Sequence, residues 1–104
     1  MEKIAFVMTL KPGYEREYEK RHEEIWPELV TELKEAGIAD YSIFLDKNSL
    51  KLFGVLKRRA HHTMDELPLK PIMKKWWAHM ADIMATNERN EPRATDLRLV
   101  FHMD

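Results

Sequence analysis

Two side chains that can exchange protons stand one helical turn apart in the first third of the chain. Tyr18 and His22 are separated by four positions, so a helix would place both on one face. Imidazole titrates near neutrality and can give or accept a proton, and a phenol hydroxyl can hold or relay a proton beside it. The plain alternative is that both belong to an apolar stripe, where a histidine is more often a packed core or interface residue.

A pair of adjacent tryptophans, Trp76 and Trp77, is the second feature with chemical interest. Neighbouring helical positions point in different directions, so one ring can pack in the core while the other reaches a cavity or an interface. Indole rings stack on the C–H-rich faces of sugars, and the indole N–H can donate to hydroxyl groups. Aromatic walls with a few convergent polar groups are typical of a pocket for a neutral sugar. The alternative is that both rings simply pack in the core.

Most other catalytic signatures are absent from the sequence. The chain has no cysteine, so thiolate catalysis, disulfides and cysteine-based zinc sites are excluded. Its glycines form no phosphate-binding loop, and neither serine lies in a nucleophile-elbow context. His62 with Glu66, and His79 with Asp82, have one-face helical spacing, but no third ligand is apparent, so we expect no metal and no cofactor. Proton transfer remains, and the simplest sugar reaction that needs nothing else is exchange between anomers.

Charge and composition narrow the classes of partner. The chain has 17 Lys and Arg against 18 Asp and Glu, so no excess charge of one sign attracts nucleic acid or an anionic membrane. Hydrophobic residues make up 44% of the 104 residues, enough for one compact core, and we expect a single domain over residues 1–104. The sequence shows neither a signal peptide nor the roughly 18–20 apolar residues of a membrane span, and its lack of cysteine suits a reducing cytoplasm.

Two helical segments must position these residues. The first is predicted over residues 14–36, where apolar residues recur in steps of three and four. Pro27 cannot donate a backbone hydrogen bond, so we expect the helix to kink or restart there, with Pro27 in the first turn of its second half. Gly37 is expected to end it. The second segment is predicted over residues 61–84, broken by its prolines, and a polar loop follows over residues 86–93.

Four segments have the composition and alternation of strands, and they are predicted over residues 3–10, 40–46, 50–56 and 96–102. The resulting order, β-α-β-β-α-β, predicts an α+β fold. It is a ferredoxin-like sandwich, in which two helices cover one face of a four-stranded antiparallel sheet. The other face has no helix left to cover its apolar side chains. A second copy of the chain is the simplest cover, so we predict a homodimer built face to face through the sheets.

At these residues the sequence resembles the L-rhamnose mutarotase family, and the likeness covers nearly the whole chain. The central motif is Tyr-x-x-x-His-x-x-Ile-Trp-Pro-Glu-Leu, from Tyr18 to Leu29, followed by Trp76-Trp77. Further matching stretches lie at residues 5–8 and 41–46, and at Met80, Asp82 and Met84. The resemblance implies a homodimeric, ferredoxin-like or dimeric α+β barrel protein. It would be an isomerase without a cofactor that interconverts the α and β anomers of L-rhamnose in the cytoplasm and feeds rhamnose catabolism.

The resemblance also implies roles for five residues. His22 would be the proton donor, and the sugar would be bound by Tyr18, Tyr41, Trp76 and Trp77. In this hypothesis, protonated His22 gives its proton to the ring oxygen while a base removes the proton of the anomeric hydroxyl. The ring then opens, the C1–C2 bond turns, and closure returns the opposite anomer. The sequence does not identify the second proton carrier, for which Tyr18 and a bound water are the candidates.

Two segments depart from the family's pattern. Thr86-Asn87-Glu88 stands where an Asn-Pro-Asp-like turn is expected, and residues 58–63 are basic and rich in histidine where the family tends to be acidic. Both lie outside the matched site motifs, so they bear on substrate preference and loop closure more than on reaction type. Preference among L-rhamnose, L-mannose and L-lyxose is not specified by residue types and spacing.

Two other functions fit the same fold class. The first is a small cofactor-free monooxygenase of the dimeric α+β barrel class, which would also use an aromatic pocket and would consume oxygen. The second is a non-catalytic ligand-binding or structural dimer, which would leave anomer exchange unchanged.

Overall fold

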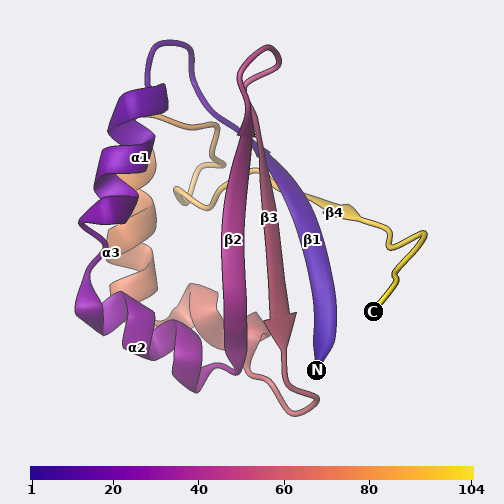
Figure 1. Ribbon diagram of the computed structural model, residues 1–104. Coiled ribbons are helices and arrows are strands. Elements are labelled where there is room, and N and C mark those ends of the chain that lie inside the picture. The colour runs from indigo at the N-terminus through magenta and orange to yellow at the C-terminus, as the bar shows by residue number, and fades with distance from the viewer.

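The helices of the computed structural model, which describes residues 1–104, all lie on one side of a four-stranded antiparallel sheet (Figure 1). The strands are β1 (Glu2–Thr9), β2 (Ile38–Asp46), β3 (Lys51–Arg58) and β4 (Thr95–Leu97), and their order is β2-β3-β1-β4. The helices are α1 (Glu15–Glu23), α2 (Pro27–Glu35) and α3 (Pro71–Met80), with the 3-10 helix η1 at Met64–Leu69. The predicted α+β, ferredoxin-like arrangement is confirmed.

The helical segment predicted over residues 14–36 is divided into α1 and α2. Pro27 begins α2, as predicted, because this position needs no backbone N–H and suits the fixed φ of proline. Trp26 before it is extended, with φ −68° and ψ 130°, the conformation that a following proline favours. Gly37 ends the second helix with φ of 96°, a left-handed conformation in which glycine carries no side-chain strain.

The prediction for residues 61–84 is only partly right, because the α-helix is confined to α3. The first part is the 3-10 helix η1, which contains Pro68, a residue that an α-helix does not tolerate in its interior. Pro71 then begins α3 in the position that proline prefers. Ile83 and Met84 belong to the predicted stripe but lie beyond the helix, where they are still buried.

The closing strand predicted over residues 96–102 is present only as β4. It pairs with residues 5–7 of β1, and the chain then leaves the edge of the sheet and extends away from the helices (Figure 1, yellow). The alternating apolar pattern continues into residues that no strand or helix of the chain covers. The side chains of Leu99, Val100, Phe101 and Met103 are between 62% and 86% exposed. We call residues 98–104 the C-terminal arm.

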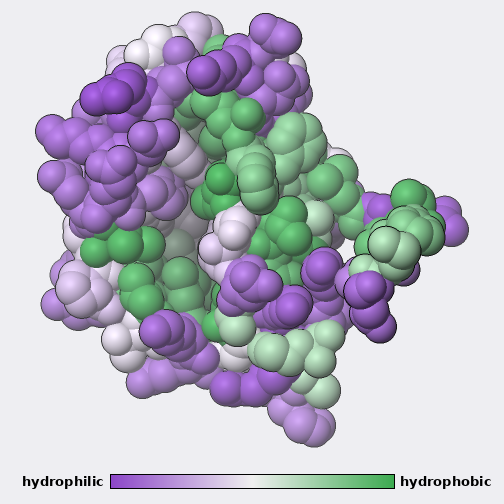
Figure 2. All heavy atoms as spheres, in the orientation of Figure 1, coloured by the Kyte–Doolittle hydropathy of each residue, from purple (hydrophilic) through white to green (hydrophobic).

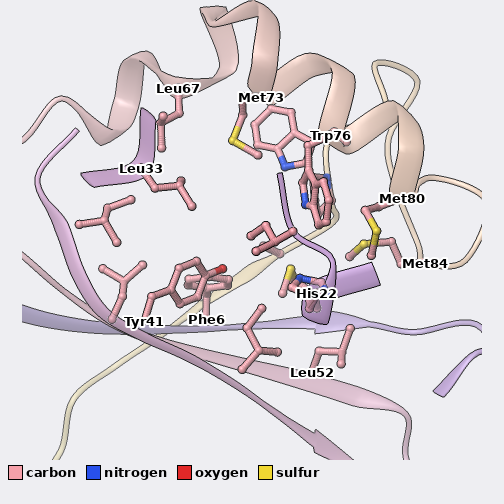
Figure 3. A pocket seen from close by; sticks show the side chains of 18 of the residues that line it. Phe6, His22, Leu33, Tyr41, Leu52, Leu67, Met73, Trp76, Met80 and Met84 are labelled. Carbon is pink, nitrogen blue, oxygen red and sulfur yellow. The ribbon is translucent and has the colours of Figure 1, made fainter. Parts of the chain in front are cut away.

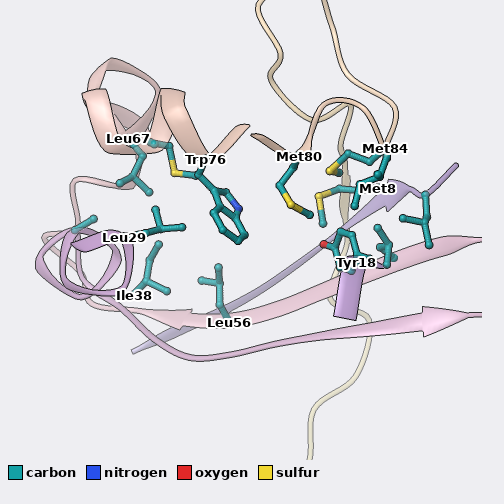
Figure 4. Packing of buried hydrophobic residues seen from close by; sticks show 14 residues of the cluster. Met8, Tyr18, Leu29, Ile38, Leu56, Leu67, Trp76, Met80 and Met84 are labelled. Carbon is teal, nitrogen blue, oxygen red and sulfur yellow. The ribbon is translucent and has the colours of Figure 1, made fainter. Parts of the chain in front are cut away.

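The core lies between the helices and one face of the sheet (Figure 4). Both the sheet and the helices contribute to it. Its buried members include Met8, Leu29, Leu52, Leu56, Met73 and Met80. On the opposite face of the sheet, Phe53 is the cross-strand neighbour of Val7 and of Phe44, and Phe44 is 64% exposed. This face therefore carries apolar side chains without cover. None of the helices has the length and apolar run that crossing a membrane requires.

Candidate active site

A cavity of about 1060 Å³ opens between the sheet and the helices. Of its 31 lining residues 23 are hydrophobic, so a few polar groups stand among apolar walls. Figure 2 shows a hollow between the hydrophilic surface of the helical side and the apolar side chains over the sheet. Ligand sites in proteins commonly measure roughly 300–1,000 Å³, so this cavity has ample room for one small molecule.

The five residues predicted for the site all line this cavity, and they are Tyr18, His22, Tyr41, Trp76 and Trp77. Helix α1 supplies Tyr18 and His22 from one face, strand β2 supplies Tyr41 and helix α3 supplies the two tryptophans. Figure 3 shows His22, Tyr41 and Trp76 around the cavity. Trp76 is also a core residue with 6% exposure, whereas Trp77 is only partly buried. Packing in the core and lining the cavity therefore do not exclude each other for this pair of tryptophans.

The His22 ring is oriented by its own helix. Its Nδ1 lies 2.9 Å from the backbone oxygen of Tyr18, so in the neutral ring Nδ1–H donates to that oxygen and Nε2 keeps its lone pair. The ring centroid lies 4.4 Å from that of Tyr18 and 5.4 Å from that of Trp76. Burial lowers the pKa of His22 below its ordinary value of 6.5, and the hydrogen bond to Tyr18 only partly opposes this. The imidazole is therefore neutral at rest near neutral pH.

The two phenols are held in their protonated forms. Burial raises the pKa of Tyr41 to about 12, and it raises the pKa of Tyr18 still further, with a smaller contribution from the nearby Tyr41. One side of Tyr41 is exposed, but its hydroxyl turns inward beside Phe6, whose ring centroid lies 6.2 Å away (Figure 3). Both hydroxyls can therefore donate a hydrogen bond as well as accept one.

The polar atoms of these side chains are free to meet a ligand. Neither the Tyr18 hydroxyl nor the Tyr41 hydroxyl forms a hydrogen bond within the protein, and the N–H groups of the two tryptophans form none either. No polar side-chain atom of a buried or half-buried residue is both fully enclosed and without a partner, so the free groups of Tyr18, Trp76 and Trp77 keep some exposed surface. Donors and acceptors spread around apolar walls suit a small molecule with several hydroxyl groups.

Two aromatic neighbours of Trp76 were not predicted from the sequence. Trp26 meets Trp76 edge to face at 5.1 Å, and the His79 ring lies 5.5 Å from Trp26 and 5.7 Å from Trp76. His79 is exposed, yet its ring completes this aromatic cluster. The sequence feature that could have indicated Trp26 is its position directly before Pro27. The proline favours an extended backbone at Trp26 and so restricts where its ring can lie.

The floor of the cavity depends on a glycine. The ring of Phe6 lies directly over Gly54 of β3, where an added Cβ would stand 2.5 Å from the ring. This close approach is available only to glycine, and it keeps the Phe6 ring low beside Tyr41. The sequence marks Gly54 only as a glycine inside a strand.

The spacings that suggested metal ligands serve other contacts. No group of three or more histidine, aspartate or glutamate side chains converges as a metal site requires. Asp82 accepts hydrogen bonds from Arg21 at 2.8 and 3.2 Å, and the His79 ring packs at a tilt against Trp26 and Trp76.

Known proteins resemble this chain over its full length. A sequence model of the L-rhamnose mutarotase family matches residues 3–103. L-rhamnose mutarotases of Brucella anthropi and Rhizobium etli are 60% and 62% identical to it over 102 residues, which cover 98% of this chain and 96% of each relative. The crystal structure of an L-rhamnose mutarotase from Formosa agariphila superposes with a TM-score of 0.94 at 40% identity, over 100% of both chains. The Mycobacterium tuberculosis protein Rv0793 shares the fold alone, with a TM-score of 0.59 at 13% identity. The chain belongs to the L-rhamnose mutarotase family.

Proposed function

We propose that this protein is an aldose mutarotase, an isomerase that interconverts the α and β anomers of L-rhamnose. The observation that carries the proposal is the convergence of His22 with the free polar groups of two tyrosines and two tryptophans on one apolar cavity. The relatives from Brucella anthropi and Rhizobium etli bear the name L-rhamnose mutarotase. L-rhamnose suits such walls because it is a deoxy sugar, with a methyl group at one end and hydroxyl groups around the ring.

In this proposal, Trp76 and Trp77 contact the C–H faces of the pyranose and donate to its hydroxyl groups. The hydroxyls of Tyr18 and Tyr41 form the remaining directional contacts, since neither has a partner in the protein. Fixing the pyranose from two sides holds its anomeric centre against His22. Orientation of this kind lowers the barrier without any covalent step.

Because His22 is neutral at rest, we propose that it first accepts a proton, whereas the resemblance implied that it first donates one. A protonated resting His22 does not agree with a lowered pKa, so the neutral ring first acts as a base. Its Nε2 takes the proton of the anomeric hydroxyl, the C1–O5 bond breaks, and the ring oxygen takes a proton from a hydroxyl or water in the cavity. After rotation about C1–C2, the same transfers run in reverse on the other carbonyl face. The His22 ring thus acts as base and then acid, with no net change in the enzyme.

We also propose a homodimer in which two subunits pair through the helix-free faces of their sheets. Support comes from the uncovered face with Phe44 and Phe53 and from the exposed apolar side chains of the C-terminal arm. The absence of cysteine suits the reducing cytoplasm, where we place this single-domain enzyme at the start of rhamnose catabolism.

Anomer exchange of L-rhamnose, measured by proton NMR saturation transfer with and without the purified protein, tests the function. The proposal predicts exchange between the two anomeric signals that appears only with protein. L-mannose should also react, because an apolar pocket rejects an added hydroxyl group by only about 100-fold. Absence of acceleration with either sugar would reject the proposal, and oxygen consumption with an aromatic substrate would favour the monooxygenase.

A further inference from the structure

One arginine beside His22 binds the end of a second helix. The Arg21 side chain is 14% exposed, and its Nε donates to Glu17 at 2.7 Å. Its Nη1 donates to the backbone oxygen of His79 at 2.7 Å and to Asp82 at 2.8 Å, while Nη2 reaches the other oxygen of Asp82 at 3.2 Å. The planar guanidinium thus makes a two-pronged contact with Asp82 and also satisfies a carbonyl at the end of α3.

The Arg21–Asp82 pair, two residues beyond the last residue of α3, is the one ion pair that joins α1 to the end of α3. Helix α1 has nine residues, of which only Tyr18 is buried, so it is short and has little apolar surface to hold it in place. Its last turn carries His22, whose ring must meet Trp76 of α3 at 5.4 Å. The position of α1 on α3 therefore decides where the imidazole lies in the cavity.

We propose that Arg21 is a positioning residue, whose guanidinium fixes the last turn of α1 against the end of α3 and so keeps His22 in place beside Trp76. Arg21 does not line the cavity and touches no group that meets the sugar directly. Asp82 is its acceptor and shares the role. The kinetic part of this inference rests on the proposed function. The competing explanation is that Arg21 stabilises the fold and does nothing more.

The geometry of the Arg21–Asp82 contact is tested by substitutions that keep the charge or the size of the side chain. Arg21→Lys keeps the positive charge but loses the planar fork, and Asp82→Asn keeps the shape but loses the carboxylate. Because displacement by about 1 Å is enough to cost up to 100-fold, we expect kcat for anomer exchange to fall about 10- to 100-fold with little change in KM. Arg59→Lys is the matched control, since Arg59 likewise donates to the last turn of a helix, at the Glu35 oxygen 2.7 Å away, and does not line the cavity. It should leave kcat unchanged.

A spectroscopic measurement separates positioning from stability. The His22 ring protons lie against the rings of Tyr18 and Trp76, so their NMR frequencies carry ring-current shifts. We expect these resonances to move toward those of an exposed histidine in Arg21→Lys and Asp82→Asn, at temperatures well below each Tm. The control should show no such movement.

A folded Arg21→Lys protein with unchanged His22 resonances and unchanged kcat would overturn the inference, even with a lowered Tm. If the wild-type protein does not exchange anomers, the proposed function fails. In that case, the His22 resonances still decide the positioning role.

Discussion

At the scale of single residues, the protonation of His22 makes stability depend on pH. The folded state lowers the pKa of His22 below 6.5, so the unfolded chain binds more protons in the window just below that pH. The stability that the neutral ring contributes is therefore complete above pH 6.5 and is lost as the pH falls through the lower folded-state pKa. We expect His22→Asn to lack this part of the pH dependence. Urea unfolding at a series of pH values measures it, and identical profiles for the two proteins would contradict the assignment.

A second residue-scale prediction concerns the cavity floor. In Gly54→Ala, the new methyl group would stand within 2.6 Å of two atoms of the Phe6 ring, which must move up into the cavity. Overpacking of this kind costs about 1–3 kcal/mol, and the raised ring should also increase KM for the sugar. The double variant Gly54→Ala with Phe6→Leu has a smaller side chain over residue 54, so it should recover part of the lost free energy of unfolding. Strictly additive effects on the free energy of unfolding would show that the two side chains do not interact.

At the scale of elements, the break between α1 and α2 sets the aromatic cluster. In the wild-type protein the Trp26 ring packs edge to face on Trp76. Pro27→Ala removes the restriction that the proline places on the backbone of Trp26. We expect a stability loss of about 0.5–1 kcal/mol and a weaker near-ultraviolet circular dichroism signal from the coupled rings. Pro12→Ala, in an exposed turn, is the control and should leave that signal intact. An unchanged signal in Pro27→Ala would mean that packing alone orients Trp26.

The helix and strand boundaries show which parts of the fold the local sequence determines. Proline and glycine fix backbone geometry directly, so the restart at Pro27 and the end at Gly37 were predictable from the sequence. The 3-10 helix η1 and the short β4 were not predicted correctly. Apolar periodicity does not separate a 3-10 helix from an α-helix over one or two turns. It also does not reveal whether a partner strand lies beside a given alternating segment.

At the scale of the whole molecule, the five residues predicted for the site from spacing and resemblance line one cavity. Tyr18 and His22 lie one turn apart on one helix, so their common face followed from their spacing. The two tryptophans were singled out by residue type and adjacency, whereas Tyr41 entered by resemblance alone; the structure places all three on the same cavity. The contacts of His79 with the tryptophan rings and of Arg21 with Asp82 were not predicted, because they depend on how α1 packs against the end of α3. No local pattern records that packing.

The proposed homodimer gives a prediction at the same scale. Phe101 is 75% exposed on the C-terminal arm, and burying it between subunits would remove a large apolar area from water. Phe101→Asp should therefore weaken the dimer in analytical ultracentrifugation, since an unpaired charge would be buried in the interface. Leu69→Asp is a matched control, because Leu69 is 71% exposed but lies on η1, outside the sheet face. Equal sedimentation of Phe101→Asp and wild type as dimers would exclude the arm from the interface.

The central claim is that His22 transfers protons to and from a sugar bound in this cavity. Anomer exchange of L-rhamnose by NMR saturation transfer should be compared for the wild type, His22→Asn and His79→Asn. His79 is the matched control because its ring belongs to the same aromatic cluster but does not line the cavity. Acid–base catalysis contributes about 10²–10⁴-fold, so His22→Asn should fall by that factor while His79→Asn keeps most of its activity. Full exchange activity in a folded His22→Asn protein would contradict the account.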